Sequence, residues 1–120
     1  MVFSEIVDIL ASATDLPLRL IHNDKIEECV IYKITPINDN GIKRQDRLEI
    51  KIVGYDLEQV ELQDLKIRKA LLSFGDREDY FTSIELNGGG MIGGGMDKDQ
   101  YTDTLTKYSF YILTSKSEVQ

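Results

Sequence analysis

A change of hydrophobic period between residues 47 and 74 constrains the fold of this chain more than any other feature of its sequence. The segment opens with Leu48-Glu-Ile-Lys-Ile52, in which apolar and charged side chains alternate with the two-residue period of a half-buried strand. Gly54-Tyr55-Asp56 interrupts this alternation, and Asp56 is suited to cap the N-terminus of a helix. From residue 57 to residue 74 the apolar side chains follow helical spacing instead. We therefore predict a strand that leads directly into a helix of about five turns.

Helical spacing also occurs at the beginning of the chain, and strand-like segments make up most of the remainder. Residues 2–13 predict an amphipathic helix that ends before Pro17. Residues 28–34 are largely apolar and predict a central strand. Because Asn38-Asp-Asn-Gly41 is a strong turn signal, the strand that begins at Arg47 is expected to return antiparallel to residues 28–34. Further strands are predicted at residues 18–21, 80–86 and 101–113.

These elements predict an α+β fold with a mostly antiparallel sheet of four to five strands and two helices packed on one face. We expect residues 1–114 to form a single domain and residues 115–120 to be a polar C-terminal tail. On the last strand, Tyr108, Phe110 and Ile112 are expected to face the core. The rest of the predicted core comes from the two helices and the strand between them: Ile6, Leu10, Ile50, Ile52, Ile67 and Leu71.

Composition narrows the possible classes of function. The 120-residue chain has a formal net charge of −7, which argues against broad contact with nucleic-acid phosphates, so we expect no specific nucleic-acid partner. Its apolar runs are too short to cross a bilayer, so we expect no membrane partner. Cys29 is the single cysteine and cannot form an internal disulfide. These features are typical of a cytosolic product.

The most unusual stretch is Asn87-Gly-Gly-Gly-Met-Ile-Gly-Gly-Gly-Met96. Its glycines satisfy the G-x-G-x-x-G spacing of dinucleotide-binding proteins, but no helix pattern follows them, and the G-K-[ST] of a P-loop is missing. We expect a flexible, glycine-rich hairpin loop between two strands, because glycine has no side chain to order it. Met91 and Ile92 at the loop tip would be poorly placed for a monomer's own core, and we expect them to dock on another subunit.

The sequence offers no recognisable catalytic or metal-binding pattern. His22 is the only histidine, and no second imidazole or thiol pattern accompanies it. Cys29 lies in an apolar strand and is best explained as a small buried side chain. Asp97, Asp99 and Asp103 lack the glycine and terminal glutamate of an EF-hand. We therefore expect no enzymatic activity, no metal site and no cofactor.

Apolar side chains in excess of one core indicate contacts between subunits. On the predicted second helix, Leu62, Leu65 and Leu72 lie beside the main apolar stripe, although a deeply embedded helix is an alternative explanation. On the last strand, Tyr111 and Leu113 make the second face apolar as well. Together with the loop tip they form the candidate subunit interface: Leu62, Leu65, Leu72, Met91, Ile92, Tyr111 and Leu113.

The layout of the chain resembles that of the tail terminator, or tail-completion, proteins of long-tailed bacteriophages and prophages. The likeness is carried by the N-terminal amphipathic helix and by Leu48-Glu-Ile-Lys-Ile-Val-Gly-Tyr55 leading into a long helix. The glycine-rich stretch and the long closing segment 101–112 fit the same layout. The resemblance covers nearly the whole chain and rests on architecture, because the family has no invariant signature.

This resemblance implies a non-enzymatic structural protein of the virion that assembles in the host cytoplasm as a homo-hexameric ring. Such a ring caps the tail tube and forms the surface for head–tail joining. The implied partners are other copies of the chain, the major tail tube protein and the head–tail connector proteins. One alternative is a head–tail connector or minor capsid protein of similar size. An alternative from a different class is an acidic monomeric module that binds a host protein, which a stable monomer in solution would favour.

Overall fold

The computed structural model describes residues 2–20, 28–72 and 84–116. His22, residues 73–74 of the predicted second helix and residues 80–83 of a predicted strand lie outside these residues. Within the described ranges, two helices and five strands follow one another along the chain: α1 (Val2–Ala13), β1 (Leu18–Arg19), β2 (Cys29–Asp39), β3 (Lys43–Gly54), α2 (Leu57–Leu72), β4 (Ile84–Lys98) and β5 (Leu105–Lys116).

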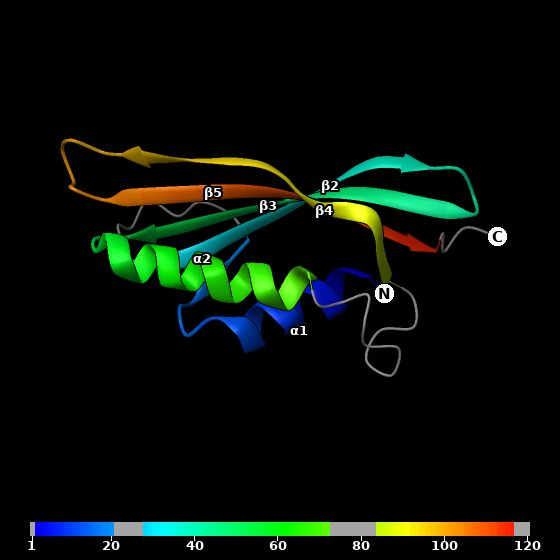
Figure 1. The fold of residues 1–120 in the computed structure, drawn as a ribbon, viewed down its shortest axis with the longest axis horizontal. Coiled ribbons are helices and arrows are strands. Elements are labelled where there is room, and N and C mark those ends of the chain that lie inside the picture. Colours follow the sequence, from blue (N-terminus) through cyan, green and yellow to red (C-terminus); the bar gives the residue numbers. More distant parts are fainter. Residues whose placement is uncertain (1, 21–27, 73–83, 117–120) are drawn as a thin grey trace.

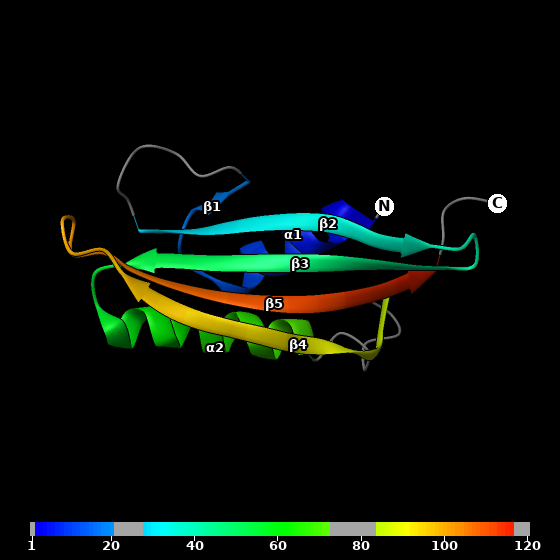
Figure 2. The same cartoon turned by 90° about the horizontal axis from the view of Figure 1, so that it is seen from above.

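The five strands form one sheet in the order β1-β2-β3-β5-β4, so the last strand of the chain lies between β3 and β4, as Figure 2 shows. β1 pairs with β2 in parallel, and the other three pairs are antiparallel. Both helices lie on the same face of the sheet (Figure 1). The predicted α+β fold with a mostly antiparallel sheet and two helices on one face is therefore confirmed.

The β2–β3 hairpin confirms the predicted antiparallel return and is longer than predicted. Pairing between the two strands continues as far as Asp39 and Arg44. The turn stays short because Asp39 Oδ1 accepts a hydrogen bond from the Gly41 amide at 3.0 Å. Gly41 has a φ of 85°, a left-handed conformation that glycine adopts without steric cost. Local turn chemistry therefore extends both strands toward the turn.

α2 begins where the sequence predicts. Asp56 Oδ1 accepts a hydrogen bond from the Glu58 amide at 3.1 Å, which confirms Asp56 as the N-cap. Gly54, at the end of β3, lets the helix approach the strand closely, because a Cβ at this position would lie 2.8 Å from Val60 Cγ2. The same approach buries Val60, which is 2% exposed.

The core lies between the two helices and the sheet face that they cover. Six predicted core residues belong to it and are confirmed: Ile6, Leu10, Ile50, Ile52, Ile67 and Leu71. The cluster also contains residues that were not named in the predicted core: Ile9, Val30, Tyr32, Leu48, Val60, Tyr111 and Leu113.

β5 presents its two faces in the opposite sense to the prediction. Tyr111 and Leu113 are 1% and 0% exposed and belong to the core. Tyr108, Phe110 and Ile112 lie on the face away from the helices, so their predicted place in the core is wrong. The assignment of Tyr111 and Leu113 to a subunit interface is corrected in the same way, because both side chains are buried within the chain itself.

Ser109 explains why the faces of β5 were misassigned. Its hydroxyl makes this position look solvent-facing in the sequence, yet the residue is 1% exposed. Ser109 Oγ donates a hydrogen bond to Asp64 Oδ1 at 3.0 Å, and Asp64 is itself 2% exposed. A serine can occupy this core position because its hydrogen-bond partner is buried with it.

The chain reverses between β4 and β5 at residues 99–104, not at the glycine-rich stretch, which corrects the expected position of the hairpin. Gly93 and Gly95 lie in β4 and pair with Phe110 and Tyr108 of β5. A Cβ at Gly95 would lie 2.7 Å from the Tyr108 hydroxyl oxygen, and one at Gly93 would lie 3.7 Å from Phe110 Cδ2. Aromatic side chains of β5 therefore cover the space that these glycines leave open, which lets the glycines take part in a strand.

Candidate functional site

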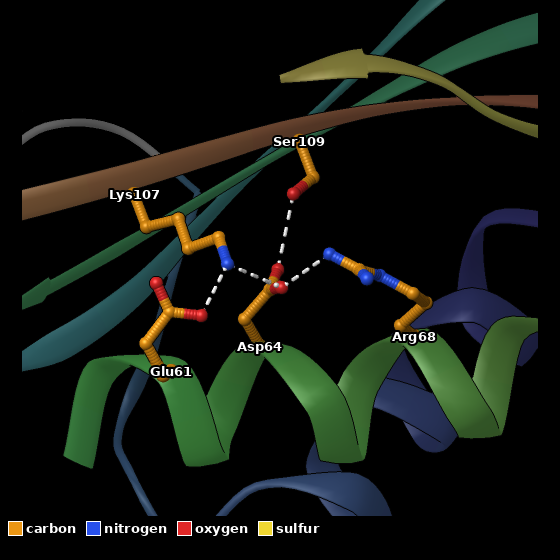
Figure 3. Close-up of polar contacts among 5 residues, drawn as sticks. All are labelled: Glu61, Asp64, Arg68, Lys107 and Ser109. Carbon is orange, nitrogen blue, oxygen red and sulfur yellow. Dashed lines mark hydrogen bonds and ion pairs between the residues drawn. The ribbon is translucent and has the colours of Figure 1, made fainter. Parts of the chain in front are cut away.

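Asp64 is the centre of a polar cluster between α2 and β5 (Figure 3). Its carboxylate accepts hydrogen bonds from Ser109 Oγ at 3.0 Å and from Arg68 Nη2 at 2.6 Å, and lies 3.1 Å from Lys107 Nζ. Lys107 Nζ also donates a hydrogen bond to Glu61 Oε2 at 2.6 Å. The Asp64 side chain is only 3% exposed, whereas that of Glu61 is 50% exposed. The surrounding donors are what allow a carboxylate to lie in the core.

Two structural periods bring these five side chains together. Glu61, Asp64 and Arg68 are separated by three and four residues on α2, so they lie along one side of the helix. Lys107 and Ser109 are two residues apart on β5, so they share the face that points toward the helices. The cluster thus ties α2 to β5 beside the apolar core.

The electrostatic environment fixes the protonation states of this region. Burial alone would lower the pKa of Lys107, but the hydrogen bonds and negative charges of Asp64 and Glu61 outweigh it and raise this pKa above its ordinary value. Burial raises the pKa of Tyr111, and the charge of Asp64 raises it further, while Arg68 acts in the opposite direction. At neutral pH, Lys107 is therefore charged and Tyr111 is neutral.

The chemistry of the cluster suits a structural anchor. Its central carboxylate is enclosed by donors and its lysine is protonated, so neither is poised to act as a base. Among the described residues, no group of three or more His, Cys, Asp or Glu side chains could hold a metal ion. No helix in the described part of the chain is long and apolar enough to span a membrane.

Two of the predicted interface residues lie on the outer side of α2. Leu62 and Leu65 are each 44% exposed, although the same helix buries its main apolar stripe in the core. The structure thus brings these two leucines together on one solvent-facing side of the helix. Leu72, Met91 and Ile92 were predicted to join them, but the structure describes only the backbone of these three residues and not their side chains.

The sheet face away from the helices carries an aromatic strip. The ring centroids of Tyr108 and Phe110 are 5.9 Å apart, and the Arg47 guanidinium lies 5.8 Å from the centre of the Phe110 ring. Arg47 also pairs with Glu49 at 3.2 Å. These side chains are partly buried, so the strip is a semi-exposed surface.

Sequence reasoning missed the apolar side chains at the two ends of the sheet. Tyr101, in the β4–β5 turn, is 99% exposed, and near the β2–β3 turn Ile37 and Ile42 are 52% and 76% exposed. The signal for Tyr101 was present in Asp99-Gln-Tyr-Thr-Asp103, which has aspartates at both ends of a turn between two strands. Because the hairpin was predicted at the glycine-rich stretch, residues 99–103 were not predicted to form the turn.

Comparisons with known proteins find similarity in fold but not in sequence. No protein-family model matches the chain, and no curated protein sequence matches it. A chain in the solved structure of the virion of a native gene transfer agent (GTA) particle is similar, with a TM-score of 0.60 and 8% sequence identity. The alignment covers 97% of this chain and 92% of that chain. The two chains therefore share one fold over nearly their whole lengths.

Proposed function

We propose that this chain is a non-enzymatic structural protein of a phage-like particle, and that it caps the tail tube as a homo-oligomeric ring at the head–tail joint. The observation that carries the proposal is the fold shared with a chain of the gene transfer agent virion, at 97% and 92% coverage of the two chains. Coverage of this extent leaves little of either chain outside the common fold. The resemblance of the sequence layout to tail terminators points to the same class of particle.

Under this proposal, the partners of the chain are further copies of itself, the major tail tube protein and the head–tail connector proteins. The chain would be found in the virion at the head–tail joint, after assembly in the host cytoplasm. A ring needs a heterologous contact, in which one surface of a copy meets a different surface of the next copy. The exposed leucines of α2, Leu62 and Leu65, supply one of these two surfaces.

Introducing a negative charge at Leu65 of α2 tests whether this helix forms the contact between copies in the ring. Leu65→Glu is expected to change the free energy of unfolding by less than about 0.5 kcal/mol, because the side chain is already solvent-exposed. It is also expected to shift the protein to smaller species in sedimentation velocity, because the charge would be buried in the contact between copies. Ile67→Glu is the matched control: this position is 0% exposed, so the substitution should unfold the chain.

Each contrary result has a definite meaning. Unfolding of the Leu65→Glu protein would show that Leu65 belongs to the core of the chain. If the unaltered chain forms oligomers in solution and the Leu65→Glu protein sediments in the same way, the α2 leucines are excluded as a contact between copies.

The place of the ring in the particle needs a separate test. Tails made without heads and heads made without tails should be purified and probed for the chain. A tail-capping protein should be found on the tails, whereas a connector or minor capsid protein should be found on the heads. A stable monomer that is absent from both would favour the acidic module that binds a host protein.

A further inference from the structure

One end of the elongated molecule gathers exposed apolar side chains. Gly54, the last residue of β3, pairs with Leu105 of β5, and Leu105 pairs with Lys98, the last residue of β4. The start of α2 and the β4–β5 turn therefore lie at the same end of the longest axis, which measures 49 Å (Figures 1 and 2). Three exposed apolar side chains belong to this end: Tyr55 (49%), Leu57 (51%) and Tyr101 (99%).

The turn that carries Tyr101 is held in one conformation by its own hydrogen bonds. Asp99 Oδ1 accepts from the amides of Tyr101 at 2.8 Å and Thr102 at 3.3 Å. The Asp103 amide donates to the Asp99 carbonyl at 2.9 Å. A 99% exposed ring adds almost nothing to the packing of the described chain. A tyrosine on an ordered turn is, however, well suited to anchor a protein contact, because little conformational freedom is lost when it binds.

The surroundings of these side chains are acidic. We define the acidic end as residues 54–58 and 97–104. These residues include five carboxylate side chains and one cationic side chain, Lys98, which pairs with Asp103 at 3.2 Å. Two copies of such a surface would repel each other, so the acidic end is unsuited to contact itself. Its charge instead complements a basic surface. The carboxylates are Asp56, Glu58, Asp97, Asp99 and Asp103.

We propose that the acidic end docks on a different protein of the particle, one that presents an apolar socket surrounded by lysine and arginine side chains. Tyr101 enters the socket, and the carboxylates around it pair with the basic side chains. This inference rests on the proposed function, because it takes the partner to be a protein of the same particle. It separates two contacts: the α2 leucines meet the next copy, and the acidic end meets the other protein.

The test compares variants in a strain that makes the particles. Deletion of the gene should abolish joined particles, and a gene encoding the Tyr101→Ser chain should lower their yield about tenfold. Tyr101→Phe keeps the ring and should retain the yield. The purified Tyr101→Ser protein should keep the thermal midpoint and the sedimentation of the unaltered chain. Asp97→Lys, at an exposed position, should also lower the yield because it reverses one of the complementary charges.

The outcomes distinguish this inference from the proposed function. If deletion leaves joined particles at full yield, the proposed function is wrong and the docking surface is excluded with it. If deletion abolishes them while Tyr101→Ser and Asp97→Lys both assemble at full yield, only the docking surface is excluded. Should Tyr101→Ser lower the thermal midpoint, the Asp97→Lys variant decides: a lowered yield supports docking, and a full yield overturns it.

Discussion

Replacing Asp64 by alanine tests whether the polar cluster anchors α2 to the sheet. The carboxylate is 3% exposed and is shared by Ser109, Arg68 and Lys107. Removing one partner from a buried ion pair costs about 3–5 kcal/mol, because the opposite charge is left without compensation. Here the side chains of Arg68 and Lys107 keep 33% and 17% exposure, and Lys107 keeps its bond to Glu61. We therefore expect Asp64→Ala to lower the free energy of unfolding by about 2–4 kcal/mol.

Urea unfolding followed by far-ultraviolet circular dichroism measures this loss, since the chain has no tryptophan to serve as a fluorescent reporter. Glu61→Ala is the matched control. It removes a carboxylate from the same helix and from the same lysine, but the Glu61 side chain is 50% exposed. We expect the control to cost less than about 1 kcal/mol, as exposed ion pairs do. Equal losses in the two variants, or a loss below about 1 kcal/mol for Asp64→Ala, would refute the anchoring role.

Two further predictions concern close packing and pH. Gly54→Ala should lower the free energy of unfolding by about 1–3 kcal/mol, because the new Cβ would lie 2.8 Å from Cγ2 of the buried Val60. Gly95→Ala should cost less than about 1 kcal/mol, because it meets the movable end of the partly exposed Tyr108 ring; equal urea midpoints for the two variants would contradict this. The raised pKa values of Lys107 and Tyr111 mean that the folded chain holds these protons more tightly than the unfolded chain. Their contribution to stability is therefore fully present below the unfolded values of about 10 and is lost as the pH rises through the folded values. The urea midpoint should therefore be lower at about pH 11 than at about pH 8, and Tyr111→Phe should make this difference smaller. Identical midpoints for the unaltered chain at the two pH values would contradict the predicted loss of stability with rising pH.

The strand-to-helix segment could be predicted because its local pattern and its tertiary environment agree. Every inward position of β3 from Leu48 to Ile52 is apolar and buried, and the charged positions between them face outward. Asp56 caps α2 through a bond to a residue only two positions away. Where burial follows the period of the element, the sequence alone suffices to assign the faces.

β4 and β5 could not be assigned in this way, because contacts between distant residues decide which side chains are buried. Both faces of β5 carry large apolar side chains, so alternation does not distinguish them. The deciding contact joins Ser109 to Asp64, 45 residues away in sequence. Likewise, Gly95 takes part in a strand because Tyr108 covers it. Neither relation is visible in the sequence before the pairing of the strands is known.

The residues of the candidate site also differ in whether local sequence pattern or contacts between distant residues determine their exposure. Leu62 and Leu65 could be predicted to lie outside the core, because helical spacing places them beside the apolar stripe of α2. Tyr101 could not be recognised, because its exposure depends on which residues form the turn. For the polar cluster, the sequence shows only the helical spacing of Glu61, Asp64 and Arg68, because the partners that join them, Lys107 and Ser109, come from β5.

The inner side of α2 is already complete without its exposed leucines. Val60, Ile67 and Leu71 are 2%, 0% and 0% exposed, and the polar cluster holds the side of the helix next to β5. Burying a leucine supplies about 1.5–3 kcal/mol, and Leu62 and Leu65 forgo much of this, since each is 44% exposed. Their removal from water therefore requires a surface supplied by another molecule. We therefore propose that the next copy supplies this surface, and we expect replacement of either leucine to leave the folded chain intact while weakening the contact between copies.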